Sequence, residues 1–323
     1  MSDPVTIAVY TQSLSGHRGE YLARVQQLFP TIRAAHTYQL LTPKPLLFLM
    51  IEDNFLLFLL TALLRAVLGN RTVGFLFRPL PAANGTNSRL TIKRYCLALL
   101  RRIDAIHVLS IIPTPLAPQI TPLCDGWIYD LQYWDLDRAV KEPKQKKSAR
   151  TITAIGQQTR SKGFETLAKT VFRSEQYKFR SAGAIDADLN ESKALLEAAG
   201  GTIIDEYLKP TTLIEEYLNA DIIWCAYAPD YDQSSGILGR AMQLGKDVIV
   251  REGSTSHRFC VAHGMTHLAI TDAQDARAQL TNNAWVNTDE KITDRSILMM
   301  HSMDVLSNSL GISQTTDIVK CPS

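Results

Sequence analysis

The sequence predicts an α/β protein made of two doubly wound domains with a cleft between them. Short apolar runs alternate with helix-length segments along the chain, which is typical of βαβ units in a parallel sheet. The 323 residues are also enough for two separate hydrophobic cores. We expect a first domain over residues 1–145 and a second over 146–295. A last helix and tail, 296–323, are expected to pack back across the domain junction.

The first half contains five strand-like runs, which are apolar enough to be covered on both faces of a sheet. They are VTIAVYT, TYQLLT, LLFLM, TVGFLF and AIHVLS. Between them, the spacing of apolar residues indicates helices at about residues 17–29, 54–68 and 87–103. The polar, basic segment Lys141–Arg150 is the best candidate for a linker.

The second half repeats the alternation more regularly. Its expected strands are TITAIG, KFRSAG, GTIIDEY, DIIWCAY, DVIVRE and HLAIT, and its last helix covers about Thr293–Leu310. In a doubly wound sheet, ligands bind outside the carboxyl ends of the strands. We therefore look for a site in the loops that follow these strands.

The charge of the chain is unevenly distributed. Residues 1–150 contain 18 Lys+Arg and 10 Asp+Glu, giving +8, whereas the remaining 16 and 22 give −6. The basic half either faces an anionic surface or ligand or is simply an uneven solvated surface. The first residues lack the pattern of a signal peptide, so we expect a cytoplasmic protein.

Metal, disulfide and nucleic-acid sites have no support in the sequence. The five cysteines are scattered and never at CxxC spacing. Two aspartates separated by one residue can bind a metal, but this pattern occurs three times in the chain. We therefore interpret it as a chance occurrence and not as a metal site. The three pairs are Asp135/Asp137, Asp186/Asp188 and Asp230/Asp232. We expect no metal, no cofactor and no nucleic-acid partner.

Two strand–loop–helix segments have the features of a phosphate site. In YDQSSGILGRAMQLGKDVIV (Tyr231–Val250), a Ser-Ser-Gly turn opens a helix, whose unpaired N–H groups and positive dipole end suit a diphosphate. In IGQQTRSKGFETLAKT (Ile155–Thr170), the loop carries Arg160, Lys162 and Gly163. Two such loops on one parallel sheet can hold a diphosphate from both sides. An ordinary helix cap is the alternative for the Ser-Ser-Gly turn.

The segment Phe55–Gly69 is apolar nearly all round but too short to span a bilayer. It is either a buried helix of the first domain or a helix that dips into one leaflet, with neighbouring basic residues meeting lipid phosphates. Those basic residues are Arg65, Arg71, Arg78, Arg89, Lys93, Arg94, Arg101 and Arg102.

Through these motifs the chain resembles the GT-B glycosyltransferases, most of all family 4 of the retaining, nucleotide-sugar-dependent enzymes. The resemblance is best over residues 151–252, and it implies two Rossmann-like domains with the donor site in the second. The family's Gly-Arg…Lys-Gly loop is matched by Gly156, Lys162 and Gly163, while Gln157 replaces the arginine. Arg160 would then supply the missing cation, because the leaving diphosphate gains negative charge.

The family's second signature is a pair of glutamates eight positions apart around a Gly-rich turn. Asp232 takes the place of the first, which hydrogen-bonds the donor sugar and would be catalytic here. Arg240 replaces the second, which binds the nucleotide ribose, although arginine cannot accept hydrogen bonds. The remaining donor-site residues implied by the resemblance are Gln233, Ser234, Ser235 and Gly236.

GT-B enzymes often place a glycine-containing loop after the first strand, facing the acceptor. In TQSLSGHRGEYL, Gly16 and Gly19 allow a sharp turn that leaves His17 and Arg18 exposed. His17 would take the proton of an acceptor hydroxyl, and Arg18, with Gly16, would bind a phosphate of the acceptor. A plain surface loop is the alternative.

The resemblance implies a cytoplasmic, metal-independent glycosyltransferase that uses a nucleotide-sugar as co-substrate. The acceptor class it suggests is a polyprenyl-diphosphate-linked saccharide of bacterial exopolysaccharide or O-antigen assembly, reached at the inner membrane surface. Gln157 and Arg240 favour an alternative, a non-catalytic subunit that binds a nucleotide-sugar or a partner transferase. A third possibility is a GT-B sugar-nucleotide epimerase.

Overall fold

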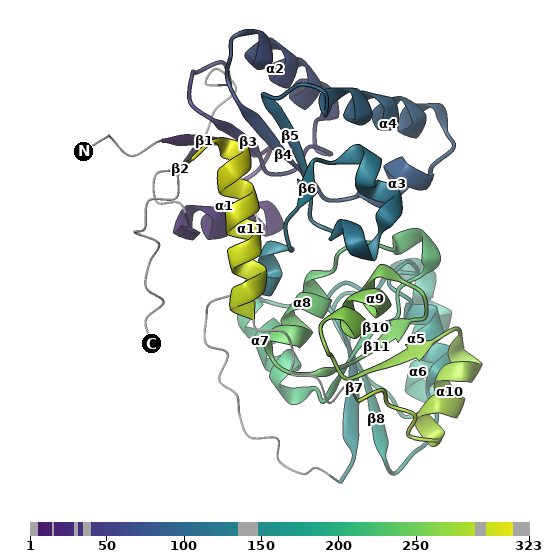
Figure 1. The fold of residues 1–323 in the computed structure, drawn as a ribbon. Helices are drawn as coiled ribbons and strands as arrows, with labels where there is room; N and C mark the ends of the chain where they lie inside the picture. The colour runs from purple at the N-terminus through teal and green to yellow at the C-terminus, as the bar shows by residue number, and fades with distance from the viewer. Residues whose placement is uncertain are drawn as a thin grey trace. The chain divides into compact units, whose positions relative to one another are not determined.

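A computed structural model describes residues 6–14, 16–28, 32–34, 40–134, 148–287 and 295–312. The chain divides into two compact units, Met1–Leu131 with Ser296–Ser323, and Gln132–Arg295. Each unit contains a six-stranded sheet in which all the strands described are parallel, so the α/β class is confirmed (Figure 1). The expected domain boundary at residue 145 and most of the expected linker lie outside the described residues.

The sheet of the first unit has the order β2-β1-β3-β4-β5-β6. Its strands are β1 (Ile7–Tyr10), β2 (Ile32–Ala34), β3 (Leu46–Phe48), β4 (Thr72–Leu76), β5 (Ile106–Ser110) and β6 (Gly126–Trp127). The chain steps from β1 outward to β2 and then returns to place β3 on the other side of β1. The strand order therefore reverses between β1 and β3.

The predicted helices of this unit form, and the structure adds α3 and two 3₁₀ turns that were not predicted. They are α1 (Gly16–Leu28), α2 (Phe55–Val67), α3 (Pro79–Asn84), α4 (Ser88–Leu100) and α11 (Arg295–Leu310), with short 3₁₀ turns at η2 (Thr114–Leu116) and η3 (Pro118–Leu123). The C-terminal helix α11 belongs to the first unit: Tyr129 N–H donates to Ser302 Oγ at 3.0 Å, and Arg71 donates to the Asn308 carbonyl at 3.1 Å.

Helix α2 is anchored through Arg65, a fully buried arginine. Its guanidinium donates five hydrogen bonds of 2.6–2.9 Å and has no carboxylate among its acceptors. The acceptors are Thr72 Oγ1 and the carbonyl oxygens of Leu40, Thr42, Lys44 and Arg71. Burial lowers the pKa of Arg65 from its ordinary value.

This anchor corrects two expectations. The strand expected over TYQLLT does not form in its described part, residues 40–42, which is a turn. There the carbonyls of Leu40 and Thr42 bind Arg65 instead of a neighbouring strand. The interpretation of α2 as a helix that dips into one leaflet would require Arg65 to meet lipid phosphates. Because Arg65 is buried, it is unavailable to them. The helix is not wholly buried either, because only Phe58, Thr61, Ala62 and Arg65 are buried in it.

The sheet of the second unit has the order β12-β11-β10-β7-β8-β9, and its six strands confirm those predicted. They are β7 (Arg150–Ile155), β8 (Tyr177–Ala182), β9 (Thr202–Ile204), β10 (Ile222–Cys225), β11 (Asp247–Arg251) and β12 (His267–Ile270). The strand order reverses between β7 and β10, which are direct neighbours in the sheet. In doubly wound sheets this switch point is where ligands bind.

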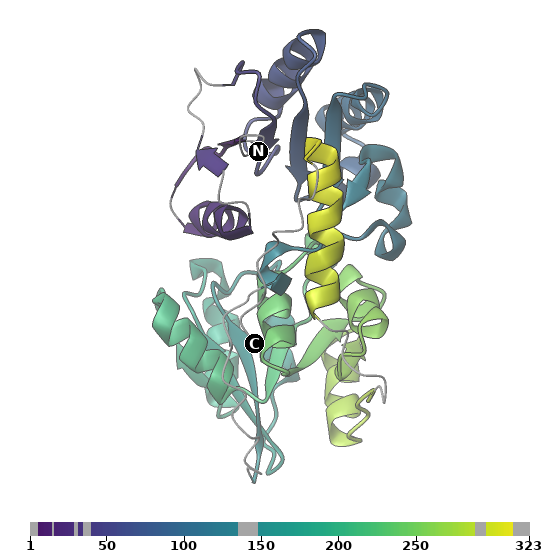
Figure 2. The same ribbon diagram turned by 60° about the vertical axis from the view of Figure 1, so that its left-hand side comes forward.

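Helices cover both faces of this second sheet (Figure 2). The helices α5 (Phe164–Thr170), α6 (Asn190–Ala198) and α10 (Ala273–Thr281) pack together, with η5 (Ala187–Leu189) beside α6. The others are α7 (Pro210–Asn219), α8 (Gly236–Gln243) and α9 (Thr255–Ala262), with η4 (Leu131–Trp134) and η6 (Pro229–Tyr231). Among the described helices of both units, none combines the length and apolarity that crossing a bilayer requires.

Replacing Arg65 with methionine tests the anchor of α2. The variant Arg65→Met removes five hydrogen bonds, one to Thr72 Oγ1 and four to carbonyl oxygens, of which the Arg71 carbonyl still accepts from Leu46 N–H. We therefore expect the free energy of unfolding to fall by about 3 kcal/mol. Urea unfolding monitored by circular dichroism measures the change. Arg102→Met, at an exposed arginine, is the control and should stay within about 0.5 kcal/mol of wild type. Equal stability of the two variants would contradict the anchoring role.

Candidate functional site

The two predicted phosphate-type loops meet at the switch point of the second sheet. One loop follows β7 and the other follows β10, so both leave the carboxyl edge of neighbouring parallel strands. They are tied together by a backbone hydrogen bond, in which Ala228 N–H donates to the Ser161 carbonyl at 2.9 Å. The site is therefore built from segments about 70 residues apart in sequence.

Gly163 lets the two loops approach each other. It has a φ of +76°, and a Cβ at this position would lie 2.1 Å from the carbonyl oxygen of Ala226. It would also lie 3.4 Å from Nε1 of Trp224, a buried indole without a hydrogen-bond partner among the described residues. Any side chain larger than that of glycine would push the first loop away from the second.

Lys162 is the cation that the first loop brings toward the second. A Cβ placed on Gly156 would lie 4.0 Å from Lys162 Nζ and 3.7 Å from Ile237 Cδ1, so these three residues surround one point. Lys162 is half-buried and forms no side-chain hydrogen bond or ion pair with any described residue. Burial lowers its pKa, and the charge of Asp186 partly opposes that shift. A bound anion would stabilise this desolvated ammonium.

The second loop contributes the start of helix α8. Ser235 caps the helix: its Oγ accepts from Leu238 N–H at 3.4 Å and is held by the Tyr227 hydroxyl at 2.7 Å. The N–H groups of Gly236 and Ile237 meet no acceptor among the described residues. Amides at the positive end of a helix can bind a phosphate or diphosphate, and the Ile237 side chain of this turn shares with Lys162 Nζ the point above Gly156. We call Lys162 and this first turn of α8 the cradle.

In the first loop, the amides next to the site are already used within the loop. The N–H groups of Lys162 and Gly163 donate within the loop, to the carbonyls of Thr159 and Arg160. Arg160, expected to supply a cation, forms ion pairs with Glu165 at 3.0 Å and Asp188 at 3.4 Å, and 62% of its side chain is exposed. Because acids already satisfy Arg160, Lys162 is the better candidate for the cation of the site.

Asp232 is held firmly in the second loop. Its Oδ1 accepts from Thr255 N–H, at the start of α9, at 2.8 Å, and its Oδ2 lies 3.7 Å from Arg251 Nη2. Arg251 also donates from Nε to the Tyr227 carbonyl at 3.0 Å, so it connects β11 to both ends of the loop. Arg251 was not among the predicted site residues, because an arginine at a strand end carries no recognisable sequence pattern.

The remaining donor-site candidates fall around this cradle. Gln157 is exposed and donates to Asp186 Oδ1 at 2.9 Å, so it does not replace the family's arginine as a charge. Gln233 and Ser234 are half-buried in the second loop. Arg240 lies half-buried one turn into α8, and its charge opposes the rise that burial causes in the pKa of Tyr217 on α7.

The acceptor-side candidates belong to the first unit. Gly16, His17 and Arg18 form the first turn of α1 instead of the loop expected there. The Arg18 guanidinium is not free: it donates two hydrogen bonds of 2.6 Å to Asp53, in the turn after β3. This pair joins the segments after β1 and β3, at the switch point of the first sheet. The side chain of His17 lies outside the described residues.

Within the described part of the chain, no three His, Cys, Asp or Glu side chains gather as metal ligands. The described cysteines, Cys96, Cys124, Cys225 and Cys260, are free thiols. Asp186 accepts from Gln157, Asp188 pairs with Arg160, and Asp232 accepts from Thr255 N–H and lies 3.7 Å from Arg251. Asp135 and Asp137 lie outside the described residues.

Solved structures share the fold of this chain, although the sequence matches no protein-family model and no curated protein. Anabaena HepE, solved with UDP and glucose, has a TM-score of 0.60 and 12% identity over 94% of this chain and 100% of HepE. The lipopolysaccharide outer core galactosyltransferase WaaB has a TM-score of 0.61 and 12% identity over 95% and 99%. S. aureus MnaA, solved with UDP, has a TM-score of 0.57 and 12% identity over 96% and 98%. The chain therefore has the two-domain GT-B fold.

Substitution of Gly163 tests the close approach of the two loops. In Gly163→Ala the new methyl group meets the Ala226 carbonyl, so we expect the free energy of unfolding to fall by about 3 kcal/mol. Gly200→Ala is the matched control, because Gly200 has a φ of +88° and nothing within 4 Å of its Cβ position. It should lose only about 1 kcal/mol in the same urea titration. Equal losses would mean that the contact with Ala226 is unimportant.

Proposed function

We propose that this protein is a glycosyltransferase that moves a sugar from a nucleotide-sugar donor to an acceptor hydroxyl. The observation that carries the proposal is the cradle at the switch point, where Lys162 Nζ and the side chain of Ile237, in the first turn of α8, lie within 4.0 Å of one point above Gly156. Among the described residues, neither the Lys162 ammonium nor the N–H groups of Gly236 and Ile237 have a hydrogen-bond partner. Such a group of donors suits the diphosphate of a nucleotide-sugar. HepE and MnaA, which share the fold, were each solved with UDP, which makes a uridine nucleotide the first to test.

In the proposed reaction, the bond between the sugar C1 and the diphosphate oxygen breaks, and a new bond forms from C1 to the acceptor oxygen. Lys162 and the α8 amides stabilise the negative charge that grows on the leaving diphosphate, so neither a metal nor a cofactor is needed. Asp232 binds the hydroxyls of the donor sugar, and His17 takes the proton of the acceptor. Configuration is retained in this proposal, as in family 4.

The acceptor we propose is a saccharide linked to polyprenyl diphosphate, in cell-surface polysaccharide assembly. WaaB, a neighbour in fold, is a lipopolysaccharide outer core galactosyltransferase, which supports this class of acceptor. The excess of positive charge in residues 1–150 also suits work at the inner face of a membrane. In this proposal the protein is cytoplasmic and binds that surface peripherally.

A second candidate function is a non-catalytic subunit that binds the nucleotide-sugar or a partner transferase. Two observations favour it. Arg240 stands where the family binds the ribose through an acid, and Asp232 already serves Thr255 and Arg251 inside its own unit. Such a subunit would still bind a nucleotide but would neither transfer nor hydrolyse the sugar.

Nucleotide binding by Lys162 is tested by thermal unfolding with a panel of UDP-, GDP-, ADP- and CMP-sugars. A ligand at 100 times its Kd should stabilise wild type by about 2.7 kcal/mol, and Lys162→Ala should lose this shift. Lys169→Ala is the control, because it removes the same charge from an exposed position on α5. No shift with any nucleotide, or an equal shift in Lys162→Ala, would contradict the proposed donor site.

The role of Asp232 is tested by Asp232→Asn, whose amide oxygen can still accept from Thr255 N–H. We expect transfer to fall at least about tenfold, because the amide no longer offers a carboxylate to the sugar hydroxyls, while the thermal midpoint changes little. Asp272→Asn, at the cap of α10, is the control and should leave transfer unchanged. Full activity in Asp232→Asn would show that Asp232 only binds the N–H of Thr255 at the start of α9 and does not bind the donor sugar.

A further inference from the structure

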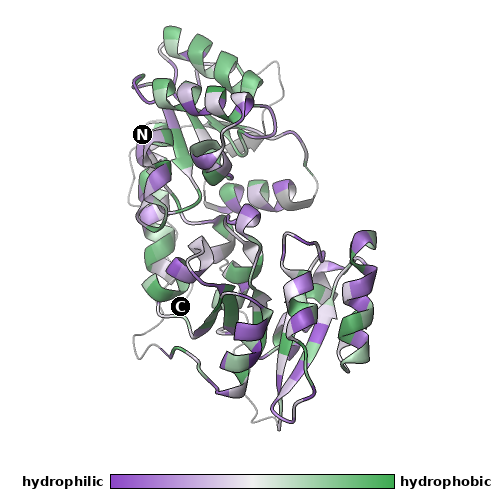
Figure 3. Ribbon diagram, turned by 90° about the vertical axis from the view of Figure 1, so that its right-hand side faces the viewer, coloured by the Kyte–Doolittle hydropathy of each residue, from purple (hydrophilic) through white to green (hydrophobic). Residues whose placement is uncertain are grey.

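Helix α2 exposes a face made of leucine and valine. These side chains follow the spacing i, i+4, i+7, i+8, i+11, so they lie on one side of the helix, opposite its buried residues. They are Leu56, Leu60, Leu63, Leu64 and Val67, and they are exposed by 38% to 85%. Figure 3 shows this helix, at the top of the view, coloured mainly as hydrophobic. A soluble surface rarely keeps so many large apolar side chains together.

Helix α4 repeats this pattern. Ile92, Tyr95 and Leu99 are exposed by 58% to 64% and share one side of the helix. Because β3, β4 and β5 are successive parallel neighbours joined by α2 and α4, right-handed connections place both helices on the same face of the sheet. Lys93 of α4 lies over the ring of Phe55 at 5.5 Å, which joins the helices directly. We call the exposed apolar side chains of the two helices the α2–α4 face.

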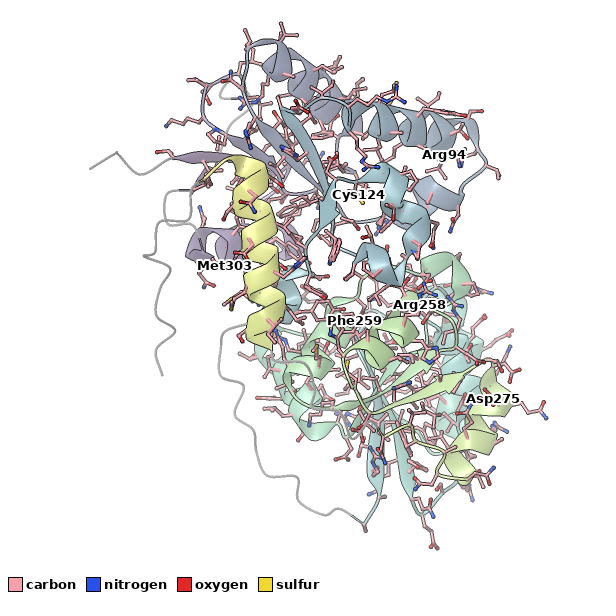
Figure 4. All side chains as sticks on the ribbon, in the orientation of Figure 1. Arg94, Cys124, Arg258, Phe259, Asp275 and Met303 are labelled. Carbon is pink, nitrogen blue, oxygen red and sulfur yellow. The ribbon has the colours of Figure 1, made fainter. Side chains whose placement is uncertain are left out.

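The charged residues within the segment that carries the α2–α4 face have a single sign. Residues 54–103 contain eight arginines and lysines and no aspartate or glutamate. Arg65 is buried, Lys93 lies 3.8 Å from Glu52, and Arg101 pairs with Asp125. The other five have no carboxylate partner among the described residues; they are Arg71, Arg78, Arg89, Arg94 (labelled in Figure 4) and Arg102.

The positions of the arginines follow the apolar rows. Arg89 precedes Ile92 by one turn, and Arg102 follows Leu99 by three residues. A surface that presents two apolar rows, one of them with an arginine at each end, matches the layered chemistry of a bilayer, in which hydrocarbon lies beneath phosphates. A second copy of this chain is a poor occupant, because it would set these arginines against one another.

We infer that the α2–α4 face docks onto an anionic lipid membrane, with its leucines in the acyl region and its arginines at the lipid phosphates. The length of α2, about 20 Å at 1.5 Å per residue, suits a helix lying in the interface and not across it. The inference deepens the proposed function, because a membrane-bound enzyme could reach a lipid-linked acceptor. It rests on the proposed function for that acceptor alone. Arg65 anchors the helix from beneath and takes no part in the contact.

Flotation with lipid vesicles tests the docking, using the full chain without nucleotide. The vesicles are phosphatidylcholine alone or phosphatidylcholine with about one third phosphatidylglycerol. We expect wild type to float with the anionic vesicles, and much less with the neutral ones. Raising the salt from about 0.1 M to about 1 M should weaken the binding, because it screens the arginines.

The triple variant Leu60→Gln/Leu64→Gln/Val67→Gln should bind anionic vesicles at least about tenfold more weakly. These side chains are exposed, so its circular dichroism and thermal midpoint should match wild type. The control changes three exposed apolar residues of the second unit, Leu195→Gln/Tyr207→Gln/Val261→Gln, and should bind as wild type does. Arg89→Gln and Arg102→Gln should each weaken binding about fivefold.

Several outcomes would overturn the inference: no flotation of wild type with anionic vesicles, or equal flotation of wild type and the triple variant. Self-association of wild type that the triple variant lacks, without lipid binding, would assign the face to a second copy instead. The outcome is separate from that of the proposed function. The triple variant keeps the donor site, so its thermal shift with nucleotide should be unchanged, and vesicle binding would survive the failure of every nucleotide to bind.

Discussion

The close approach of two backbone segments at Gly163 is the constraint on which the candidate site depends. The first loop reaches the second only because no side chain separates Gly163 from the Ala226 carbonyl. The hydrogen bond from Ala228 to Ser161 then fixes the two loops together. With the loops in contact, the Lys162 ammonium lies next to the start of α8. A methyl group at position 163 would separate the loops. The Lys162 ammonium would then lie farther from the amides of α8, with which we expect it to bind the same diphosphate.

Hydrogen bonding and ion pairing decide which cations of this protein are available to a ligand. Arg160 and Arg18 resemble anion-binding residues by their place in the chain, but acids hold both of them. Arg65 is buried among carbonyl oxygens and acts as an anchor. Lys162 has no such partner in the part of the chain that the structure describes, and burial removes part of its hydration, which is costly for an ammonium until an anion binds. Availability, more than the number of positive charges, distinguishes the candidate donor site.

Helix α2 shows how one element can serve two environments. Its inner face packs on the first sheet, and Arg65 binds the turn around Leu40 and Thr42 that replaces an expected strand. Because this buried contact holds the helix, its outer face is free to carry leucines that a core does not need. The sequence pattern was apolar nearly all round, so it suggested a buried helix or a membrane helix. The structure buries one face of the helix and exposes the other, and the membrane contact is our inference for the exposed face.

The sequence alone determined the α/β class, the six strands of the second sheet and the two loops, because apolar periodicity and glycine-rich turns are local signals. In the first unit it missed β2 and β6 and placed a strand over TYQLLT. It also singled out Lys162 and the turn around Ser235. Tertiary structure decided what each residue contacts. The pairing of Arg160 with Glu165 and Asp188, the capping of Thr255 by Asp232 and the role of Arg251 all join segments that are not recognisable as partners in sequence. Such contacts depend on which strands become neighbours in the sheet. That pairing is decided only when the whole sheet forms, because β7 and β10 are neighbours in space but far apart in sequence.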